Sequence, residues 1–305
     1  MYSVTAQATI PGLVRGATLL HCPHYDIPVL YPGHMSVTIH DVTHLVDPSF
    51  RNTLKSRVFA KSLLKLAVAK ARRIITISQY SKRMILEHVG GNESKIAVIH
   101  RYASPVFAPM VSDEAKEIVQ RSLNLTENFF LFVGSPKPSK NLPVLFEAFR
   151  LLESEHPRTE LVIIGKDKKN EPSLRALAMR LKIDRRLRWI DSVSDEILRA
   201  CYAAAEATIL PSRQEGFGLP VLESMACGTP VICANAASLP EVAGDSGLLF
   251  DPSSPQDCKA QMLRILESPQ LRDELQKKGI VRAREFDADR AVAEHTRLFL
   301  ELLAA

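Results

Sequence analysis

Short apolar runs alternate along this chain with segments of helical periodicity, and that alternation restricts the fold more than any other feature. Buried runs of about three to five residues separated by helical patterns predict parallel strands joined by crossover helices. We therefore predict an α/β protein with doubly wound, Rossmann-like sheets, although no Gly-x-Gly-x-x-Gly follows a strand. The predicted strands span 17–20, 36–39, 74–77 and 96–99, then 129–133, 161–164, 187–190, 207–211, 230–233 and 248–250.

A proline-containing stretch without periodicity, 103–113, interrupts this alternation and is interpreted as an interdomain linker. A chain of 305 residues with 46% hydrophobic content suits two domains better than one. We predict domains at 1–110 and 111–287. No run approaches a membrane span, and nothing near residues 1–10 suggests export. The five cysteines are an odd number without metal-ligand spacing, which indicates reduced thiols in a cytoplasmic protein.

The stretch 215–223 reads Glu-Gly-Phe-Gly-Leu-Pro-Val-Leu-Glu and encloses a glycine turn and the start of a helix between two acidic residues. Because Gly216 and Gly218 carry no side chains, the N–H groups of Phe217, Gly218 and Leu219 can approach an anion closely. The dipole of the following helix adds positive potential there. We predict a site for a nucleotide diphosphate.

Glu223 is expected one turn into that helix, where its carboxylate can accept hydrogen bonds from a ribose diol beside the phosphates. Glu215, on the loop, would face the group attached to the far phosphate. Taken alone, each glutamate fits a structural role better, because short motifs match by chance and an acid complements a helix N-terminus. The nine residues together favour the binding site.

The loop 134–141, between a predicted strand and helix, supplies cations for a diphosphate leaving group. Lys137 and Lys140 can neutralise negative charge on the β-phosphate in place of a metal ion, and Ser135 lies in the same loop. Two lysines in a polar loop are usually only solvated, so the assignment depends on the position of the loop between strand and helix.

Polar groups collect where the predicted N-terminal strands finish, as expected for a ligand site in an open α/β sheet. His40-Asp41 follows one of them, and its imidazole can donate or accept a hydrogen bond near a reacting sugar. A histidine at a strand end is more often structural. The histidines nearby match no standard zinc spacing, so no metal site is predicted.

Positive charge is unevenly placed, since residues 51–101 hold twelve Lys or Arg against only Glu87 and Glu93. The segment 51–73 is predicted to be a basic helix with Leu54, Val58, Leu63, Leu66 and Ala67 on one face. Such a helix can lie on anionic lipid or receive an anionic acceptor. A core helix with a solvated basic face is the alternative, and we favour it slightly.

The stretch 215–223, together with the following Met-Ala-Cys-Gly-Thr-Pro-Val-Ile of 225–232, resembles the Glu-x7-Glu motif of the retaining family-4 glycosyltransferases of the GT-B fold. The resemblance covers about 17–305. It implies two Rossmann-like domains, the N-terminal one completed by a C-terminal helix at 288–305, and metal-independent transfer of a sugar with retained configuration.

The resemblance also assigns roles to residues. Lys140, Lys137 and the amides of Phe217 to Leu219 would stabilise the leaving diphosphate. Glu223 would hold the ribose, Glu215 the sugar hydroxyls, His40 the sugar or the acceptor, and Val193 would line the nucleobase. Two departures stand out: Ser139 replaces a common Arg, and Asp191 replaces a common Gly.

The implied donor is a UDP-, GDP- or other nucleotide-sugar, with no further cofactor, and the acceptor is a glycan, a lipid-linked molecule or a small molecule. Relatives begin with further strands, so the N-terminal domain is expected to be truncated. We expect a homo-oligomer or a partner chain to cover its sheet, with residues 1–16 adding to a neighbouring chain. We expect no nucleic-acid partner, and a cytoplasmic location with peripheral contact at the inner membrane face through 51–73. A non-catalytic nucleotide-sugar-binding subunit and a GT-B-fold sugar-nucleotide epimerase remain alternatives.

Overall fold

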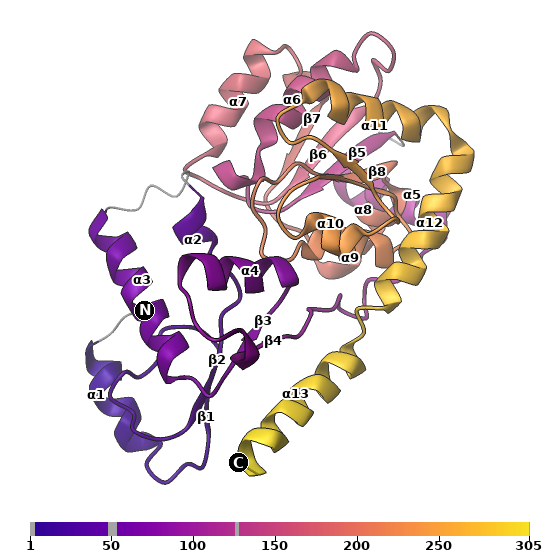
Figure 1. Cartoon of the computed structure of the whole chain (residues 1–305). Helices are drawn as coiled ribbons and strands as arrows, with labels where there is room; N and C mark the ends of the chain where they lie inside the picture. The colour runs from indigo at the N-terminus through magenta and orange to yellow at the C-terminus, as the bar shows by residue number, and fades with distance from the viewer. Residues whose placement is uncertain (1–3, 48–53, 126–127, 305) are drawn as a thin grey trace. The chain divides into compact units, whose positions relative to one another are not determined.

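The computed structural model describes residues 4–47, 54–125 and 128–304 (Figure 1). The chain divides into two compact units, with Met1–Arg101 and Ala288–Ala305 in unit 1 and Tyr102–Asp287 in unit 2. The whole stretch expected to be a linker, 103–113, thus belongs to unit 2. Phe107 is buried in the core of that unit, and Arg199 donates hydrogen bonds to the carbonyls of Ala108 (2.8 Å) and Pro109 (2.7 Å).

Unit 1 is built on one parallel sheet of four strands in the order β1-β2-β3-β4. Its elements in chain order are α1 (Val4–Leu13), β1 (Leu20–Cys22), β2 (Met35–Thr38), α2 (Thr43–Val46), α3 (Leu54–Lys70), β3 (Arg73–Thr76), α4 (Gln79–His88), η1 (Glu93–Lys95), β4 (Ile96–Val98) and α13 (Ala288–Ala304).

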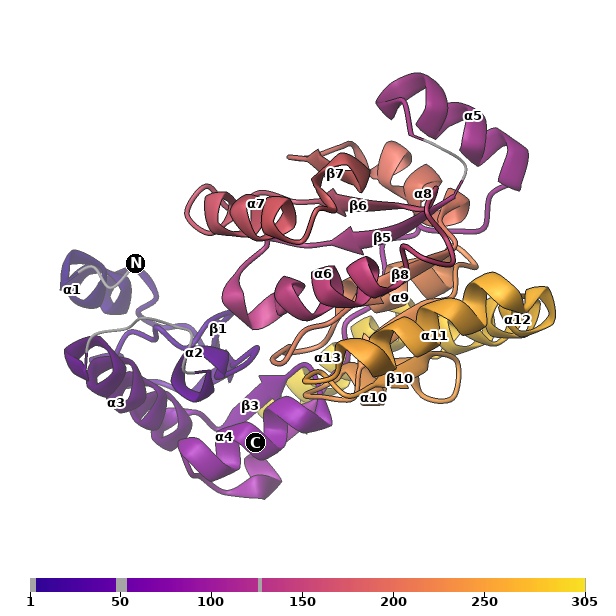
Figure 2. The same ribbon diagram turned by 90° about the horizontal axis from the view of Figure 1, so that it is seen from above.

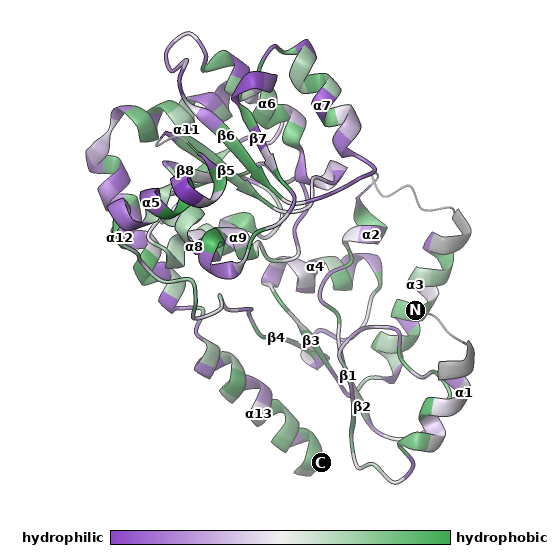
Figure 3. Ribbon diagram, turned by 180° about the vertical axis from the view of Figure 1, so that it is seen from behind, coloured by the Kyte–Doolittle hydropathy of each residue, from purple (hydrophilic) through white to green (hydrophobic). Residues whose placement is uncertain are grey.

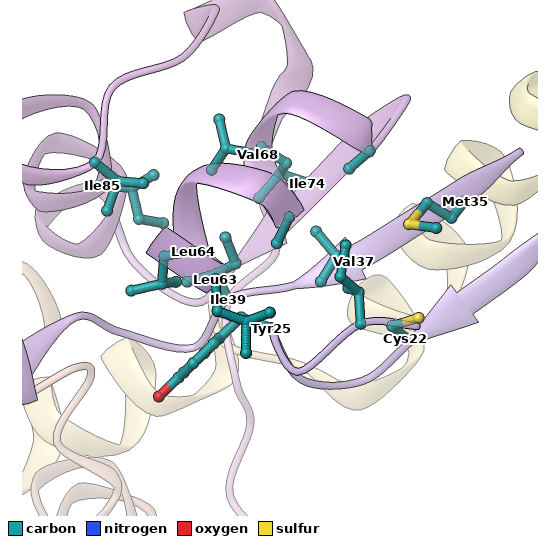
Figure 4. Close-up of a cluster of buried hydrophobic side chains, with 14 of the residues drawn as sticks. Cys22, Tyr25, Met35, Val37, Ile39, Leu63, Leu64, Val68, Ile74 and Ile85 are labelled. Atoms are coloured by element: carbon teal, nitrogen blue, oxygen red, sulfur yellow. The ribbon is translucent and has the colours of Figure 1, made fainter. Parts of the chain in front are cut away.

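The main core of unit 1 lies between the sheet and helices α3 and α4 (Figure 4). Val37 and Ile39 on and after β2, Leu64 on α3, and Ile74 on β3 are fully buried there. A second, smaller cluster joins Ile75 and Ile99 to Ala291 and Leu298 of α13. The C-terminal helix therefore completes unit 1.

The first expected strand was placed too early in the chain. The strand expected at 17–20 lies at β1, because the parallel register pairs Leu20 with Met35, the first residue of β2. Of the segment 1–16 expected to add to a neighbouring chain, Val4–Leu13 forms helix α1, and residues 1–3 lie outside the described residues. Gln7 fixes this helix to the unit by donating to the Ile27 carbonyl (2.8 Å) and accepting from the Val29 amide (2.7 Å). The expected oligomer or partner chain stays a prediction.

The predicted basic helix is α3, while residues 51–53 of the predicted segment lie outside the described part of the chain. Its buried face was predicted only in part, since Leu63 and Ala67 are buried as expected but Val58 and Leu66 are not. Val58 and Leu66 are 57% and 42% exposed, whereas the buried residues recur at helical spacing on the opposite face. Those buried residues are Ala60, Leu63, Leu64, Ala67 and Val68.

Unit 2 contains a parallel sheet of six strands in the order β10-β9-β8-β5-β6-β7. Its elements are α5 (Ser112–Leu123), β5 (Phe129–Val133), η2 (Pro138–Lys140), α6 (Leu142–Leu151), β6 (Glu160–Ile164), α7 (Glu171–Arg180), η3 (Asp184–Arg186), β7 (Leu187–Ile190), α8 (Asp195–Ala204), β8 (Ala207–Leu210), α9 (Leu219–Ala226), β9 (Val231–Ala234), α10 (Leu239–Ala243), β10 (Leu248–Phe250), α11 (Pro255–Glu267) and α12 (Pro269–Arg284).

Helices cover both faces of this sheet, and α6 and α5 lie on opposite sides of β5 (Figure 2). Helix α6 contacts α7 and α11, whereas α8 contacts α5 and α9. The central strands β5 and β6 are hydrophobic along nearly their whole length (Figure 3). Continuous apolar runs are expected where a parallel strand is buried on both faces.

The strand order places two predicted loops side by side. From β5 the chain proceeds outward to β6 and β7 and then returns to β8 on the other side of β5. The sheet therefore has its topological switch point between β5 and β8, and in open α/β sheets ligands bind outside the carboxyl ends of strands at such a point. The loop 134–141 follows β5, and the stretch 215–223 begins in the loop after β8.

Candidate functional site

Two of the predicted site residues, Lys140 and Glu215, meet at this switch point. The Lys140 ammonium is hydrogen-bonded to Oε1 of Glu215, and the two side chains are 20% and 13% exposed. Ser212 donates to the same carboxylate oxygen at 3.0 Å, and Ser238 donates to the Glu215 carbonyl at 3.0 Å. Glu215 is thus held at both its side chain and its backbone.

Backbone contacts hold the two loops against each other. The amide of Arg213 donates to the Ser139 carbonyl at 2.9 Å. The Asn141 side chain donates to the carbonyls of Pro211 (3.2 Å) and Pro252 (2.8 Å), and Asn141 itself adopts a left-handed conformation with φ of 55°. The Ser139 that replaces a common Arg is therefore buried in the contact between the loops. These contacts bring together the two loops that carry Lys140 and Glu215.

The turn into α9 depends on Gly218. Its φ is 102°, and a Cβ there would lie 2.7 Å from a methyl carbon of Leu239. Both the left-handed backbone and the close packing therefore favour glycine. Pro220 occupies the first turn of the helix, where its missing N–H removes no intrahelical bond. Phe217, which precedes the turn, is buried and packs edge-on against Phe286 with ring centroids 5.6 Å apart.

Glu223 lies on α9, half-buried, and its Oε2 accepts a hydrogen bond of 2.8 Å from the Tyr202 hydroxyl of α8. Burial raises the pKa of the Glu223 carboxyl, the Tyr202 hydrogen bond opposes that increase, and the negative charge of Asp195 adds to it. The carboxylate is thus fixed through one of its two oxygens. Tyr202 was absent from the sequence-based site, because its only signal was a polar atom within an apolar helix.

The loops after β5 and β6 approach closely beside these groups. A Cβ on Gly165 would lie 2.2 Å from the Gly134 carbonyl oxygen, so only glycine fits. Ser135 donates through Oγ to the Lys166 carbonyl at 3.1 Å. Lys137 is exposed in the same loop, and its positive charge contributes to lowering the pKa of the Asp167 carboxyl, for which the hydrogen bond from Asn170 is the main cause.

The loop after β7 carries the remaining predicted residue. Val193 is half-buried and packs against the core cluster that includes Tyr202 and Phe107. Asp191, which replaces a common Gly, forms an ion pair with Lys166 of the neighbouring loop. Since both side chains are largely exposed, this pair is expected to contribute less than about 1 kcal/mol.

His40 belongs to unit 1 and follows β2. Desolvation is the main cause that lowers the pKa of its imidazole, the charge of Arg101 lowers it further, and Asp41 opposes both. Within the described residues, Nδ1 of His40 is buried without a hydrogen-bond partner. The Asp41 carboxylate accepts from the Thr43 amide at 2.9 Å at the start of α2. His40 is therefore expected to be neutral at pH 7.

Three of the other histidines near this strand edge have local partners. Within the described residues no group of three His, Cys, Asp or Glu side chains is arranged to hold a metal ion. The pairs are His21 with Ser36 (2.9 Å) and Thr38 (3.3 Å), His24 with Asp26 (2.9 Å), and His44 with Tyr25 (3.3 Å).

Comparison with known proteins places these features in context. The family model of Glycosyl transferases group 1 matches residues 113–282. The chain is 30% identical over 269 residues to the O-antigen chain mannosyltransferase B of Escherichia coli, covering 88% of this chain and 70% of that protein. It is 26% identical over 246 residues to the O-antigen chain mannosyltransferase RfbU of Salmonella typhimurium, covering 81% of this chain and 64% of that protein.

Solved structures agree in fold. HepE of Anabaena, crystallised in complex with UDP-glucose, superposes with a TM-score of 0.82 at 18% identity, covering 98% of this chain and 82% of that chain. The likeness extends over both units and confirms the predicted α/β architecture with two parallel sheets, the first of them small.

Proposed function

Because this chain belongs to the glycosyl transferases group 1, a retaining glycosyltransferase family of the GT-B fold, we propose that unit 2 binds the nucleotide-sugar donor at its switch point. The observation that carries this proposal is the meeting of Lys140 and Glu215 from two loops 75 residues apart in sequence. A cation for the diphosphate and an acceptor for sugar hydroxyls stand together where ligands of open α/β sheets bind.

In this proposal the leaving diphosphate lies against the loop 134–141 and the turn into α9. Lys140 neutralises charge that develops on the β-phosphate, and exposed Lys137 adds to the positive potential. The amides of Phe217, Gly218 and Leu219 and the N-terminal dipole of α9 stabilise the same charge. No step then requires a metal ion, because the protein supplies the positive potential.

Glu223 holds the ribose through the carboxylate oxygen that Tyr202 leaves available, and Glu215 accepts hydrogen bonds from the sugar. Ser135 and Val193 line the donor site at the ends of β5 and β7. We assign His40 of unit 1 to the sugar or the acceptor, toward which a neutral imidazole can donate or accept a hydrogen bond. The acceptor hydroxyl attacks from the face that the diphosphate leaves, and a diphosphate oxygen takes its proton, which retains the configuration.

We further propose a hexose donor, with mannose the first candidate, and a glycan acceptor. The two mannosyltransferases of O-antigen chains support this assignment through their sequence similarity. HepE, bound to UDP-glucose, shows a related fold accommodating a nucleotide-hexose.

Helix α3 supports peripheral contact with anionic lipid. Lys61 and Lys65 are exposed on the same side of the helix as Val58 and Leu66. A mixed basic and apolar surface of this kind binds membrane interfaces through both charge and apolar burial. We propose on this basis peripheral contact at the cytoplasmic face of the inner membrane. None of the helices in the described part of the chain is long and apolar enough to cross a bilayer.

Donor binding and turnover test the main proposal. The full chain is screened by thermal shift and calorimetry against GDP-mannose, UDP-glucose and UDP-N-acetylglucosamine, and the best donor is then incubated with glycan acceptors. We expect saturable binding and release of the nucleoside diphosphate with added acceptor. Absence of binding to every nucleotide-sugar would contradict the proposal.

Flotation with vesicles tests the membrane assignment. The variant Lys61→Glu/Lys65→Glu is expected to lose binding to phosphatidylglycerol vesicles, and Val58→Ser/Leu66→Ser to weaken it. The exposed pair Lys277 and Lys278 on α12 provides a matched control, since Lys277→Glu/Lys278→Glu changes the net charge equally in unit 2. Equal losses for the two charge variants would mean that net charge, and not α3, governs binding.

A further inference from the structure

Tyr202 is fully buried behind Glu223 of the proposed donor site. Its side chain has no exposed surface, and its ring packs edge-on against Phe107 at 5.8 Å between centroids. Its carbonyl accepts a hydrogen bond of 2.7 Å from the Thr229 hydroxyl, which follows α9. The only polar atom of the side chain donates to Oε2 of Glu223 at 2.8 Å. A buried tyrosine is thus anchored on three sides with its hydroxyl aimed at one carboxylate oxygen.

We propose that Tyr202 is the positioning residue of the ribose-binding carboxylate: its hydroxyl fixes Oε2 of Glu223, so that Oε1 is presented to the ribose diol. The inference rests on the proposed function of Glu223. Without the hydroxyl, the half-buried carboxylate can rotate about its last side-chain bond and lose a donor that compensates for its burial. The Glu223 carboxylate must then be ordered when the nucleotide binds, and this ordering lowers the affinity for the nucleotide.

The same hydrogen bond has an electrostatic consequence. Burial and the charge of Asp195 raise the pKa of the Glu223 carboxyl, and the Tyr202 hydroxyl stabilises the ionised form against both. Besides Tyr202 and Asp195 on α8, Cys227 at the end of α9 interacts electrostatically with Glu223, and Arg199 interacts with Cys227. On α12, which also contacts α9, Arg282 is engaged with the carbonyls of Glu241 and Val242.

The sign of the pH dependence follows from these groups. Since the ionised carboxylate accepts from ribose, affinity for the nucleotide is expected to increase as pH rises through the pKa of Glu223. Removing the Tyr202 hydroxyl removes a group that lowers this pKa. The midpoint of the pH profile should therefore move to higher pH. A tyrosine that serves only to pack the core would not change this midpoint.

Calorimetry of the full chain with UDP and GDP between pH 4 and about 8 tests the inference, with the 2′,3′-dideoxy analogue of the tighter ligand as a probe that lacks the diol. Three variants are compared: Tyr202→Phe, which keeps the ring, Phe107→Leu, which alters packing on the ring but keeps the hydroxyl, and Glu223→Gln, which removes the charge. Far-ultraviolet circular dichroism establishes that each variant is folded.

We expect Tyr202→Phe to weaken binding of the diphosphate roughly three- to tenfold at neutral pH and to shift the midpoint upward, with no change for the dideoxy analogue. Phe107→Leu should leave the midpoint unchanged. An unshifted midpoint in Tyr202→Phe, or an equal shift in Phe107→Leu, would overturn the positioning role. These outcomes remain distinct from a failure of the proposed function, because unchanged diphosphate binding in Glu223→Ala, which removes both acceptor oxygens, would refute the ribose contact itself.

Discussion

Replacing Lys140 should impair both the stability and the turnover of this protein, and the two effects can be separated. Lys140→Met leaves the carboxylate of Glu215, only 13% exposed, without its cation. Loss of one partner costs about 3–5 kcal/mol in a fully buried ion pair, and exposed pairs are worth at most about 1 kcal/mol. Because the Lys140 side chain is 20% exposed, we expect a loss of about 1–3 kcal/mol in the free energy of unfolding.

That loss corresponds to a decrease in Tm of about 2–4 °C per kcal/mol for a domain of this size. Ser212 still donates to Glu215 in the variant, which limits the loss. Turnover should fall by about 10²–10³, the effect of removing one preorganised donor from developing charge, while donor affinity falls less.

The double variant Lys140→Met/Glu215→Gln separates the two roles. Gln retains hydrogen bonds to a sugar but needs no counter-cation, so chemical denaturation should show most of the stability restored. Steady-state kinetics should still show much lower turnover than for Glu215→Gln alone. Equal turnover in these two variants would mean that Lys140 only holds Glu215 in place, and the leaving-group assignment would be wrong.

Three further changes test the site. Glu223→Ala should weaken nucleoside diphosphate binding by about 1.5–3 kcal/mol in calorimetry, because a charged acceptor to the ribose is lost; unchanged affinity would remove that contact. His40→Ala should reduce transfer but leave binding of the bare nucleoside diphosphate intact, and weakened binding would contradict a role toward sugar or acceptor. Gly218→Ala should lower the free energy of unfolding by about 1–3 kcal/mol in urea, from the left-handed backbone and the contact with Leu239; no loss would show that the turn relaxes.

The sequence predicted unit 2 more accurately than unit 1, for a physical reason. Strand β5 has the predicted bounds, because unit 2 strands buried on both faces read as continuous apolar runs. Helices α11 and α12 were not predicted. In unit 1, the register of β1 depends on where β2 begins, and no local pattern encodes that pairing.

Helix α3 shows a second limit. Apolar residues occur on both its buried and its exposed face. Periodicity alone therefore predicted Val58 and Leu66 to be in the core, whereas Ala60 and Leu64 are buried there instead. For the site, motif residues were identifiable because their spacing is local. Tyr202 was missed because its partner comes from another helix, 21 residues away in sequence.

The discontinuity of unit 1 has a consequence for synthesis on the ribosome. Ile75 and Ile99 pack against Ala291 and Leu298, which are translated only after the whole of residues 102–287. At about 5–20 residues per second, that interval lasts on the order of 10–40 s. Throughout it, this apolar surface of the nascent chain is uncovered, while the intervening unit can already fold. Chaperones that recognise exposed apolar segments are therefore expected to bind the emerging polypeptide at β3 and β4, and to be released when α13 docks.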